Sequence, residues 1–275
     1  MRTGRFEGHV AFITGAARGQ GRSHAVRLAA EGASIIAVDI CSQIASVPYE
    51  MASEGDLRET VNLVEAVGGK IYATVADVRD RAGLESALNA GVARFGVPSI
   101  VLANAGISPQ RATEPDPQQV FIDTIETNLV GVWNTISIVA PMMIARGAGG
   151  AIVITSSAQG LIGRGGDGSG AASAYTASKH GVVGLMRSFS AWLAPHSIRV
   201  NTVHPTGVHT AMVEHPGMME WVAADPERAA TMSNPMPVGM VDVSDVTEAV
   251  LYLVGESGRY VTGVTLPVDA GFTSK

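Results

Sequence analysis

The sequence contains a single cysteine, Cys41, among its 275 residues. One thiol cannot form an internal disulfide, which excludes a disulfide-stapled secreted domain and favours a reducing compartment. We therefore expect a cytoplasmic protein. Charged residues are also scarce, at 16% against roughly 25% in typical soluble proteins. So low a share of charge in a chain of this length indicates that more surface than usual is buried, for example between subunits.

The chain also lacks a basic cluster and a long apolar run. Its formal net charge is −6, so nothing predicts a nucleic-acid footprint. No stretch approaches the ~20 unbroken apolar residues of a membrane-spanning helix. The N-terminus shows no apolar run of signal-peptide length before the first predicted strand. We expect neither a nucleic acid nor a membrane as partner.

Apolar, strand-like segments alternate with helical patterns along almost the whole chain. Short apolar strands separated by helices are typical of βαβ units, in which a parallel sheet is covered on both faces. With no linker and no internal repeat, the sequence predicts one α/β domain over 1–275, a Rossmann-type doubly wound parallel sheet of about seven strands. We expect strands at 9–14, 33–39, 71–77, 99–106, 150–157, 198–205 and 264–269, and helices near 19–31, 81–95, 117–146, 174–194 and 244–254.

Two long segments interrupt this rhythm. Residues 40–56 follow the second strand, where a short turn would suffice, and residues 205–240 contain five prolines. Long loops inside compact domains are usually functional or disordered. Both segments follow the carboxyl ends of predicted strands, where open α/β sheets bind ligands. We expect 40–56 to be an insertion near a cofactor site and 205–240 to be a substrate-binding lid region.

A glycine-rich turn, TGAARGQG at 14–21, lies between the first strand and the first helix. Glycines there allow a tight turn and let a pyrophosphate approach the helix N-terminus. Asp39 ends the second strand, where an acid would bind the adenosine ribose, or would merely cap a turn. At ~4 Å and an effective dielectric near 20, a carboxylate repels a 2′-phosphate by about 4 kcal/mol. Asp39 therefore favours NAD over NADP, whereas Arg18 in the glycine turn favours a phosphate; we give Asp39 more weight because it lies at the ribose.

The stretch AYTASKHG places Tyr175 and Lys179 four residues apart. On a helix these side chains share one face, a turn apart. Alone, such a pair is more often ordinary helix surface than a catalytic acid/base set. Lowering the pKa of a tyrosine from ~10 to about 7 takes ~4 kcal/mol. One ammonium in a partly dry site supplies an energy of that order.

Several motifs together resemble the short-chain dehydrogenase/reductase family, over about residues 8 to 271. They are TGxxxGxG, NAG at 104–106, Asn128, Ser157 and YTASK, in that order along the chain. The resemblance implies that Tyr175 is the general acid/base and that Lys179 holds the nicotinamide ribose and lowers the pKa of Tyr175. It implies that Ser157 orients the substrate oxygen and that Asn128 supports a water-linked proton path to Lys179.

The resemblance also implies a set of cofactor-binding residues for the expected NAD. They are Gly15, Arg18, Gly19, Gln20, Gly21, Asp39, Ile40, Asp77, Val78, Asn104, Ala105, Gly106, Tyr175, Lys179, Pro205, Val208, Thr210 and Met212.

The chain departs from the family pattern between Ser157 and Tyr175, whose separation is longer than usual. GRGGDGSG at 163–170 fills the gap, and we expect a mobile loop at the mouth of the substrate site. No metal is expected, because the spacing of His204, His209 and His215 does not match a compact ligand set. We interpret these histidines as strand-end and loop residues.

The segment VDICSQIASVPYEMASEGDLRETV narrows the resemblance, together with HGVVGLMR at 180–187 and HPTGVHTAM at 204–212. These stretches are similar to the carveol-dehydrogenase-like, mycofactocin-associated branch of the family. That branch implies NAD held so tightly that it does not readily exchange, with an external redox partner reoxidising NADH in place. The alternatives for 40–56 are a solvated decoration or a subunit contact.

The substrate is expected to be neutral and hydrophobic. No Arg or Lys occurs between Pro205 and Arg228, where an anionic substrate would want one. The same segment offers an apolar wall of Met212, Val213, Met218, Met219 and Trp221. We predict an NAD-dependent oxidoreductase that interconverts a terpenoid-like secondary alcohol, of the carveol type, and its ketone. The alternatives are an NADPH-dependent carbonyl reductase with exchangeable cofactor and a non-catalytic dinucleotide-binding sensor. The family commonly forms tetramers, so a homotetramer is expected.

Overall fold

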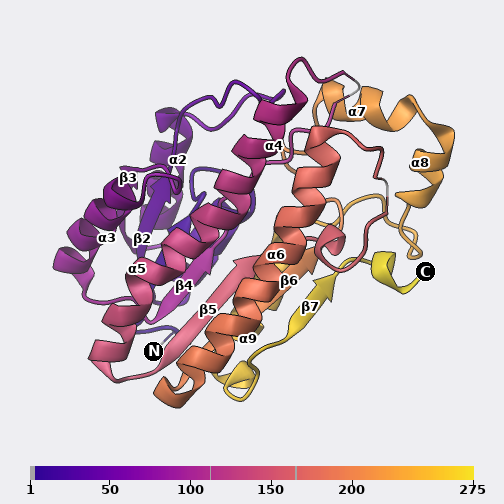
Figure 1. Ribbon diagram of the computed structural model, residues 1–275. Helices are drawn as coiled ribbons and strands as arrows, with labels where there is room; N and C mark the ends of the chain where they lie inside the picture. Colours follow the sequence, from indigo (N-terminus) through magenta and orange to yellow (C-terminus); the bar gives the residue numbers. More distant parts are fainter. Residues whose placement is uncertain (1–3, 112, 165) are drawn as a thin grey trace.

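A single parallel sheet of seven strands forms the centre of the molecule (Figure 1). The structure is a computed structural model, and it describes residues 4–111, 113–164 and 166–275. The strand order is β3-β2-β1-β4-β5-β6-β7, and every neighbouring pair is parallel. This confirms the predicted doubly wound fold. The strands are β1 Val10–Thr14, β2 Ser34–Asp39, β3 Lys70–Val75, β4 Ile100–Ala103, β5 Gly150–Thr155, β6 Ile198–Pro205 and β7 Thr265–Val268.

Helices cover the sheet on both faces (Figure 1). They are α1 Gly19–Ala30, α2 Glu54–Ala66, α3 Arg81–Phe95, α4 Pro117–Ile125, α5 Gly131–Arg146, α6 Gly170–Leu193, α7 Pro216–Ala223, α8 Pro226–Thr231 and α9 Val243–Val254. Helix α2 does not appear among the helices expected from sequence. Its signal was present, since Ser53 and Asp56 form a capping box at its start. Helices α7 and α8 lie in the segment expected to be irregular.

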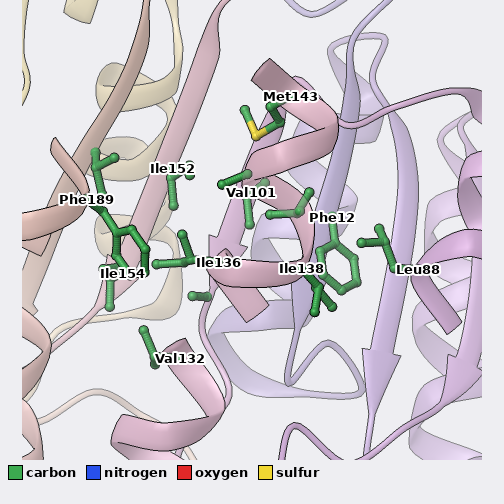
Figure 2. Close-up of a cluster of buried hydrophobic side chains, with 14 of the residues drawn as sticks. Phe12, Leu88, Val101, Val132, Ile136, Ile138, Met143, Ile152, Ile154 and Phe189 are labelled. Carbon is green, nitrogen blue, oxygen red and sulfur yellow. The ribbon is translucent and has the colours of Figure 1, made fainter. Parts of the chain in front are cut away.

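Along most of the strands, alternate residues enter two separate hydrophobic cores. Along β1, Phe12 points to the side covered by α3, α5 and α6, whereas Ala11 and Ile13 point to the side of α1, α2 and α9. This is the period-two alternation of a strand buried on both faces. Figure 2 shows Phe12 and Ile152 of the sheet in the same core as Ile136 of α5 and Phe189 of α6.

Helices α4 and α5 run as one long rod through a π-helical turn, Glu126–Val130. By length and composition this rod, Pro117–Arg146, would suit a membrane span, but more than half of its apolar stretch is buried within the protein. Val132, Ile136 and Val139 pack in the core against the sheet. The rod is therefore a core helix of this fold.

The strand order reverses at β1, which lies between β2 and β4. The connections leaving β1 and β4 run to opposite sides there, which leaves a crevice beyond the carboxyl ends of the two strands. The glycine-rich turn after β1 and the segment after β4 both enter this crevice.

Candidate active site

A cavity of about 330 Å³ lies at this crevice, a size typical of small-molecule sites. Most of the residues predicted to bind the cofactor line it: Gly15, Arg18, Gly19, Gln20, Asp39, Ile40, Asp77, Val78, Asn104, Ala105, Gly106, Thr210 and Met212. Five others from that prediction, Gly21, Tyr175, Lys179, Pro205 and Val208, do not line this cavity.

Gly21 acts through packing. A Cβ atom at this position would stand 2.0 Å from the carbonyl oxygen of Gly15 and 2.9 Å from the amide nitrogen of Asn104. Only glycine lets α1 approach the turn this closely, and Gly15 itself has φ +67°. Gly21 therefore places the helix N-terminus at the cavity without lining it.

The Asp39 carboxylate is buried at the end of β2. Its two oxygens accept the backbone N–H groups of Ala17, at 2.9 Å, and Cys41, at 3.2 Å. Burial raises the pKa of Asp39, while these N–H donors and the charge of Arg18 oppose the rise. The carboxylate both organises the glycine turn and borders the cavity.

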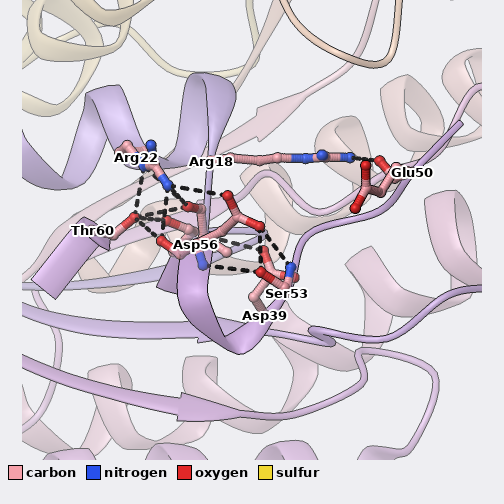
Figure 3. A network of polar contacts seen from close by, with 9 residues as sticks. Arg18, Arg22, Asp39, Glu50, Ser53, Asp56 and Thr60 are labelled. Carbon is pink, nitrogen blue, oxygen red and sulfur yellow. Dashed lines mark hydrogen bonds and ion pairs between the residues drawn. The ribbon is translucent and has the colours of Figure 1, made fainter. Parts of the chain in front are cut away.

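Arg18 reaches across the cavity to the insertion. Its guanidinium donates to the backbone carbonyl of Glu50 at 2.6 Å (Figure 3). The guanidinium thus fastens 40–56 to the glycine turn, which is a different role from the phosphate contact weighed in the sequence. Its charge still acts on Asp39 and lowers the pKa of that carboxyl.

The insertion carries a small hydrophobic core of its own. Ile44, Val47 and Tyr49 are buried together with Ile107, which follows β4, and Met212 from the lid region packs against them. The Tyr49 hydroxyl accepts the backbone N–H of Ser108 at 3.3 Å. The segment therefore bridges the cofactor cavity and the lid region.

Polar contacts hold the insertion in shape. The Gln43 side chain donates to the carbonyls of Ile44, Val47 and Tyr49, and accepts the N–H of Met51. The Ser46 hydroxyl donates to the Asp123 carboxylate of α4 at 2.6 Å. These contacts make the insertion a packed element of the cavity wall.

Ser157 follows β5, and Tyr175 lies near the start of α6. Their side chains form a hydrogen bond that lowers the pKa of Tyr175, but burial outweighs it and raises that pKa. Ser157 precedes the short 3₁₀ helix η2, Ala158–Gly160, and its hydroxyl accepts the N–H of Gln159 at 3.2 Å. The chain itself thus favours the protonated phenol.

Lys179 is almost fully buried, with 4% of its surface exposed. Its ammonium donates to the carbonyl of Thr155 at 2.9 Å and lies 5.6 Å from the centre of the Tyr175 ring. Burial lowers the pKa of Lys179 to about 8. Sequence reasoning expected Lys179 to lower the pKa of Tyr175. In the structure, the hydrogen bond from Ser157 provides the lowering contribution, and burial opposes it.

Asn128 lies inside the π-helical turn, a feature that is frequent at functional sites. Its amide exchanges two hydrogen bonds of 2.8 Å with the backbone N–H and carbonyl of Ile107. A Cβ atom at Gly106 would lie 3.2 Å from Asn128 Oδ1 and 3.4 Å from Lys179 Nζ. The π-helical turn therefore brings Asn128 and Lys179 together behind Gly106, at the inner end of the cavity.

The segment after β6 begins beside the glycine turn. Val208 forms a bridge to Val241, and the Thr210 hydroxyl donates to the Val208 carbonyl at 3.2 Å. A Cβ atom at Gly19 would touch the Thr210 methyl group at 3.2 Å. Pro205 ends β6, paired with Val268. Thr210 therefore lies against the cofactor cavity, with Pro205 and Val208 behind it.

The 163–170 loop is tied to its surroundings on both sides of Gly165, which lies outside the described residues. The Gln159 side chain donates to the Arg164 carbonyl, and Arg164 donates to the carbonyl of Phe272. Asp167 accepts the indole N–H of Trp221 from α7 at 2.7 Å. The loop therefore contacts the lid region, while its place at the mouth of the substrate site and its mobility remain predictions.

The three histidines considered for metal binding lie in three different surroundings. His204 is buried in β6, His209 pairs with Glu214 at the surface, and His215 caps the start of α7. Within the described residues no group of three His, Cys, Asp or Glu could hold a metal ion.

Sequence reasoning missed part of the cavity wall. Ile44, Tyr49, Met51, Ala52, Ala76, Ile107, Thr127, His209 and Ala211 also line the cavity. The apolar residues within 40–56 carried a usable signal, because a solvated loop has little reason to contain isoleucine and tyrosine. Thr127 and Ile107 carried none beyond their proximity to Asn128 and NAG.

Comparisons with known proteins agree with this geometry. The family model described as short chain dehydrogenase matches residues 9–220. An uncharacterized oxidoreductase of Mycobacterium tuberculosis is 53% identical over 98% of this chain and 97% of that protein. A (−)-trans-carveol dehydrogenase of Rhodococcus erythropolis is 44% identical over 98% of this chain and 99% of its own length.

Among solved structures, a carveol dehydrogenase from Mycobacterium avium in complex with NAD superposes with a TM-score of 0.90. It is 44% identical, and the match covers 99% of this chain and 100% of that one. With the sheet order, the glycine turn and the Ser157–Tyr175–Lys179 cluster already in place, the chain belongs to the short-chain dehydrogenase family of oxidoreductases.

Proposed function

We propose that this protein oxidises a neutral, hydrophobic secondary alcohol of the terpenoid class, of the carveol type, to its ketone, with NAD as the hydride acceptor. The observation that carries the proposal is the grouping of Ser157, Tyr175 and the buried ammonium of Lys179, which lies 5.6 Å from the centre of the Tyr175 ring. This cluster adjoins the inner end of a cavity suited to a dinucleotide. The named carveol dehydrogenases among the similar proteins support the substrate class.

The polar groups that line the cavity suit NAD. Among the described residues, Gln20 Oε1 and Thr127 Oγ1 are buried without a hydrogen-bond partner, and both residues line the cavity. Buried polar atoms normally have partners, so a polar ligand is the natural occupant. Asp39 would bind the adenosine ribose and exclude a 2′-phosphate, and Thr210 would bind near the nicotinamide.

Each catalytic side chain has a separate task. Ser157 would donate a hydrogen bond to the substrate oxygen and hold it near the Tyr175 hydroxyl. The ionised Tyr175 would take the alcohol proton, and Lys179 would stabilise the phenolate and hold the nicotinamide ribose. Asn128, which holds the backbone of Ile107, would support the proton path to Lys179. NAD, when bound, supplies the acceptor for the hydride.

An apolar lid agrees with a neutral substrate. Met218 and Trp221 on α7 are buried, and Met212 packs against the apolar core of the insertion. Burial of a hydrophobic substrate against such side chains is favourable, at about 25 cal/mol per Å². Residues 206–227 contain no Arg or Lys that could pair with an anionic substrate.

We infer that the insertion slows cofactor release, so that an external redox partner reoxidises NADH in place. The support is its packing across the cavity, through Arg18, Ile107 and Met212.

We also infer a cytoplasmic homotetramer. Phe121, Val130, Trp133 and Trp192 expose apolar surface on α4, the π-helical turn, α5 and α6, and sedimentation velocity would test the assembly.

Alcohol oxidation will become faster with rising pH and then level off. Below about pH 8 the rate will rise, because the reactive form of Tyr175 is the phenolate and burial holds its pKa above the usual value. Above about pH 8 the gain in phenolate is offset, because Lys179, whose pKa is about 8, loses its charge. The measurement is kcat/KM for trans-carveol between about pH 6 and 10; the two apparent values belong to the coupled pair. A flat profile would contradict the acid/base assignment.

The purified protein will retain NAD(H) through dialysis, and Arg18→Met will release it about fivefold faster. The variant keeps the aliphatic stem but loses the donor to the Glu50 carbonyl, an exposed charged hydrogen bond that contributes on the order of 1 kcal/mol. The measurement is the nucleotide released on denaturation after timed dialysis. Arg58→Met, at an exposed site on α2, is the matched control. A protein that is empty after purification would refute retention, and NADP(H) would assign Arg18 to a phosphate.

A further inference from the structure

His204 lies directly beneath the catalytic cluster, on β6. It is fully buried, and its Nδ1 lies 2.7 Å from the backbone carbonyl oxygen of Ser157. Its Nε2 lies 2.8 Å from the hydroxyl of Thr202, two residues earlier on the same face of the strand. Both ring nitrogens are therefore in contact with named partners, and one of those partners is the serine of the candidate active site.

These partners determine the tautomer. A carbonyl oxygen can only accept, so Nδ1 must carry the proton and donate it to Ser157. Nε2 is then an acceptor, and the Thr202 hydroxyl donates a hydrogen bond to it. The other acceptor near that hydroxyl, the carbonyl of Val264, is farther away at 3.4 Å. The result is a directed chain of hydrogen bonds from Thr202 through His204 to Ser157.

The surroundings keep the imidazole neutral. Burial lowers the pKa of His204 to about 4 and outweighs the hydrogen bond to the Ser157 backbone, which raises it; the charges of Lys179 and His180 lower the pKa further, and that of Asp269 raises it. A neutral ring has one donor only, so the bond to Ser157 is maintained throughout the working pH range. His204 can therefore serve as a fixed support and does not exchange protons with the substrate.

The Ser157 carbonyl is held from two sides. It also accepts the N–H of Gly160 at 2.8 Å, within the 3₁₀ turn. Next to it, the Ser156 hydroxyl donates to the Lys179 carbonyl at 2.9 Å, and a Cβ at Gly160 would clash with that carbonyl at 2.5 Å. The turn after β5 thus packs closely against α6. From β6, the His204 side chain adds a hydrogen bond to the same turn.

We propose that His204 is a positioning residue, which orients Ser157 toward the Tyr175 hydroxyl by donating its Nδ1–H to the Ser157 backbone carbonyl. The inference rests on the proposed function only in the role given to Ser157. A small displacement of a positioned group can reduce the rate by about a hundredfold, so the loss of this donor will weaken the serine's contact with Tyr175 and with the substrate oxygen.

Two isosteric variants test the proposal. His204→Asn places an amide N–H near the position of Nδ1, whereas His204→Gln places it near Nε2. Ser157→Ala is the reference for complete loss of the serine. The readouts are turnover of trans-carveol with NAD and the titration of Tyr175 in protein labelled with ¹³C at the tyrosine Cζ, which needs no substrate. Tyr175→Phe identifies the Tyr175 signal.

We expect His204→Gln to lower kcat by about tenfold to a hundredfold with little change in KM, and to raise the pKa of Tyr175 as Ser157→Ala does. His204→Asn will keep both values near those of the wild type. Equal behaviour of the Asn and Gln variants would overturn the proposal, and so would a Gln variant that melts earlier but leaves the Tyr175 titration unchanged. If Ser157→Ala itself alters neither readout, the role of Ser157 in the proposed function fails, which is a separate result.

A further measurement keeps the proposal testable where a variant does not fold. In wild-type protein labelled with ¹⁵N histidine, the His204 ring will be neutral with its proton on Nδ1 near neutral pH. A proton on Nε2 would exclude donation to Ser157 and overturn the inference.

Discussion

Tyr175→Phe will reduce turnover of trans-carveol by about 10²-fold to 10⁴-fold, the usual contribution of a positioned acid/base group. The substitution removes only the hydroxyl that bonds to Ser157, while the ring beside the Lys179 ammonium remains. Cofactor retention should therefore be unchanged, because the glycine turn, Asp39 and the insertion are not altered. The measurement is kcat together with the amount of NAD(H) released on denaturation.

The matched control is Tyr260→Phe, at a side chain that is 88% exposed and remote from the cluster. Its activity should equal that of the wild type. Near-normal turnover by Tyr175→Phe would refute the assignment of this tyrosine as the acid/base. If the wild type oxidises no neutral terpene alcohol, the substrate class is wrong, and the catalytic assignment must then be tested with other secondary alcohols.

Asp39→Asn will narrow the preference for NAD over NADP by about 10²-fold to 10³-fold. The carboxylate repels a 2′-phosphate by about 4 kcal/mol at ~4 Å and an effective dielectric near 20, with some loss to solvent screening. Asparagine keeps an acceptor for the shorter bond from Ala17 and loses the one for Cys41. Any resulting change in the turn acts on both cofactors, so the ratio of their affinities reports the charge. The measurement is the dissociation constant of each cofactor for protein stripped of nucleotide.

Asp77→Asn is the informative comparison, since it removes the same charge from the same cavity. The Asp77 carboxylate is already paired with Arg79 at 2.7 Å, so its loss should leave the ratio of the two affinities within about twofold, whatever happens to their absolute values. An unchanged ratio in Asp39→Asn would mean that Asp39 acts only as a turn cap. The NADPH-dependent alternative would then be favoured.

The sheet, its covering helices and most of the cavity could be predicted from sequence, because each depends on local pattern. Strands buried on both faces leave continuous apolar runs, and Gly15, Gly19 and Gly21 mark a turn whose position between strand and helix is itself informative. The four catalytic side chains could be given their roles only through the family resemblance. The spacing of Tyr175 and Lys179 alone did not distinguish a site from a helix surface.

What could not be predicted depends on contacts between distant segments. His204 was interpreted as a strand-end residue. Its partner is the backbone carbonyl of Ser157, and every residue has such a carbonyl, so the sequence does not indicate the contact. The hydrogen bond from Arg18 to the Glu50 carbonyl could not be predicted for the same reason, because its acceptor is also a backbone atom. The burial that raises the pKa of Tyr175 could not be predicted either, because burial depends on the whole surrounding fold. Helix α2 was missed although its capping box was present.

The anchoring of the insertion has a consequence for evolution and engineering. Gln43 and Arg18 bind its main-chain carbonyls, so the shape of the segment does not depend on the side chains at three of its exposed positions, Ser42, Ala45 and Glu50. Those positions can diverge among homologues while the cover keeps its form, and alignments scored by residue identity will understate how well this region is preserved. They are also the natural points at which to attach a tether or a reporter group to the closed cavity.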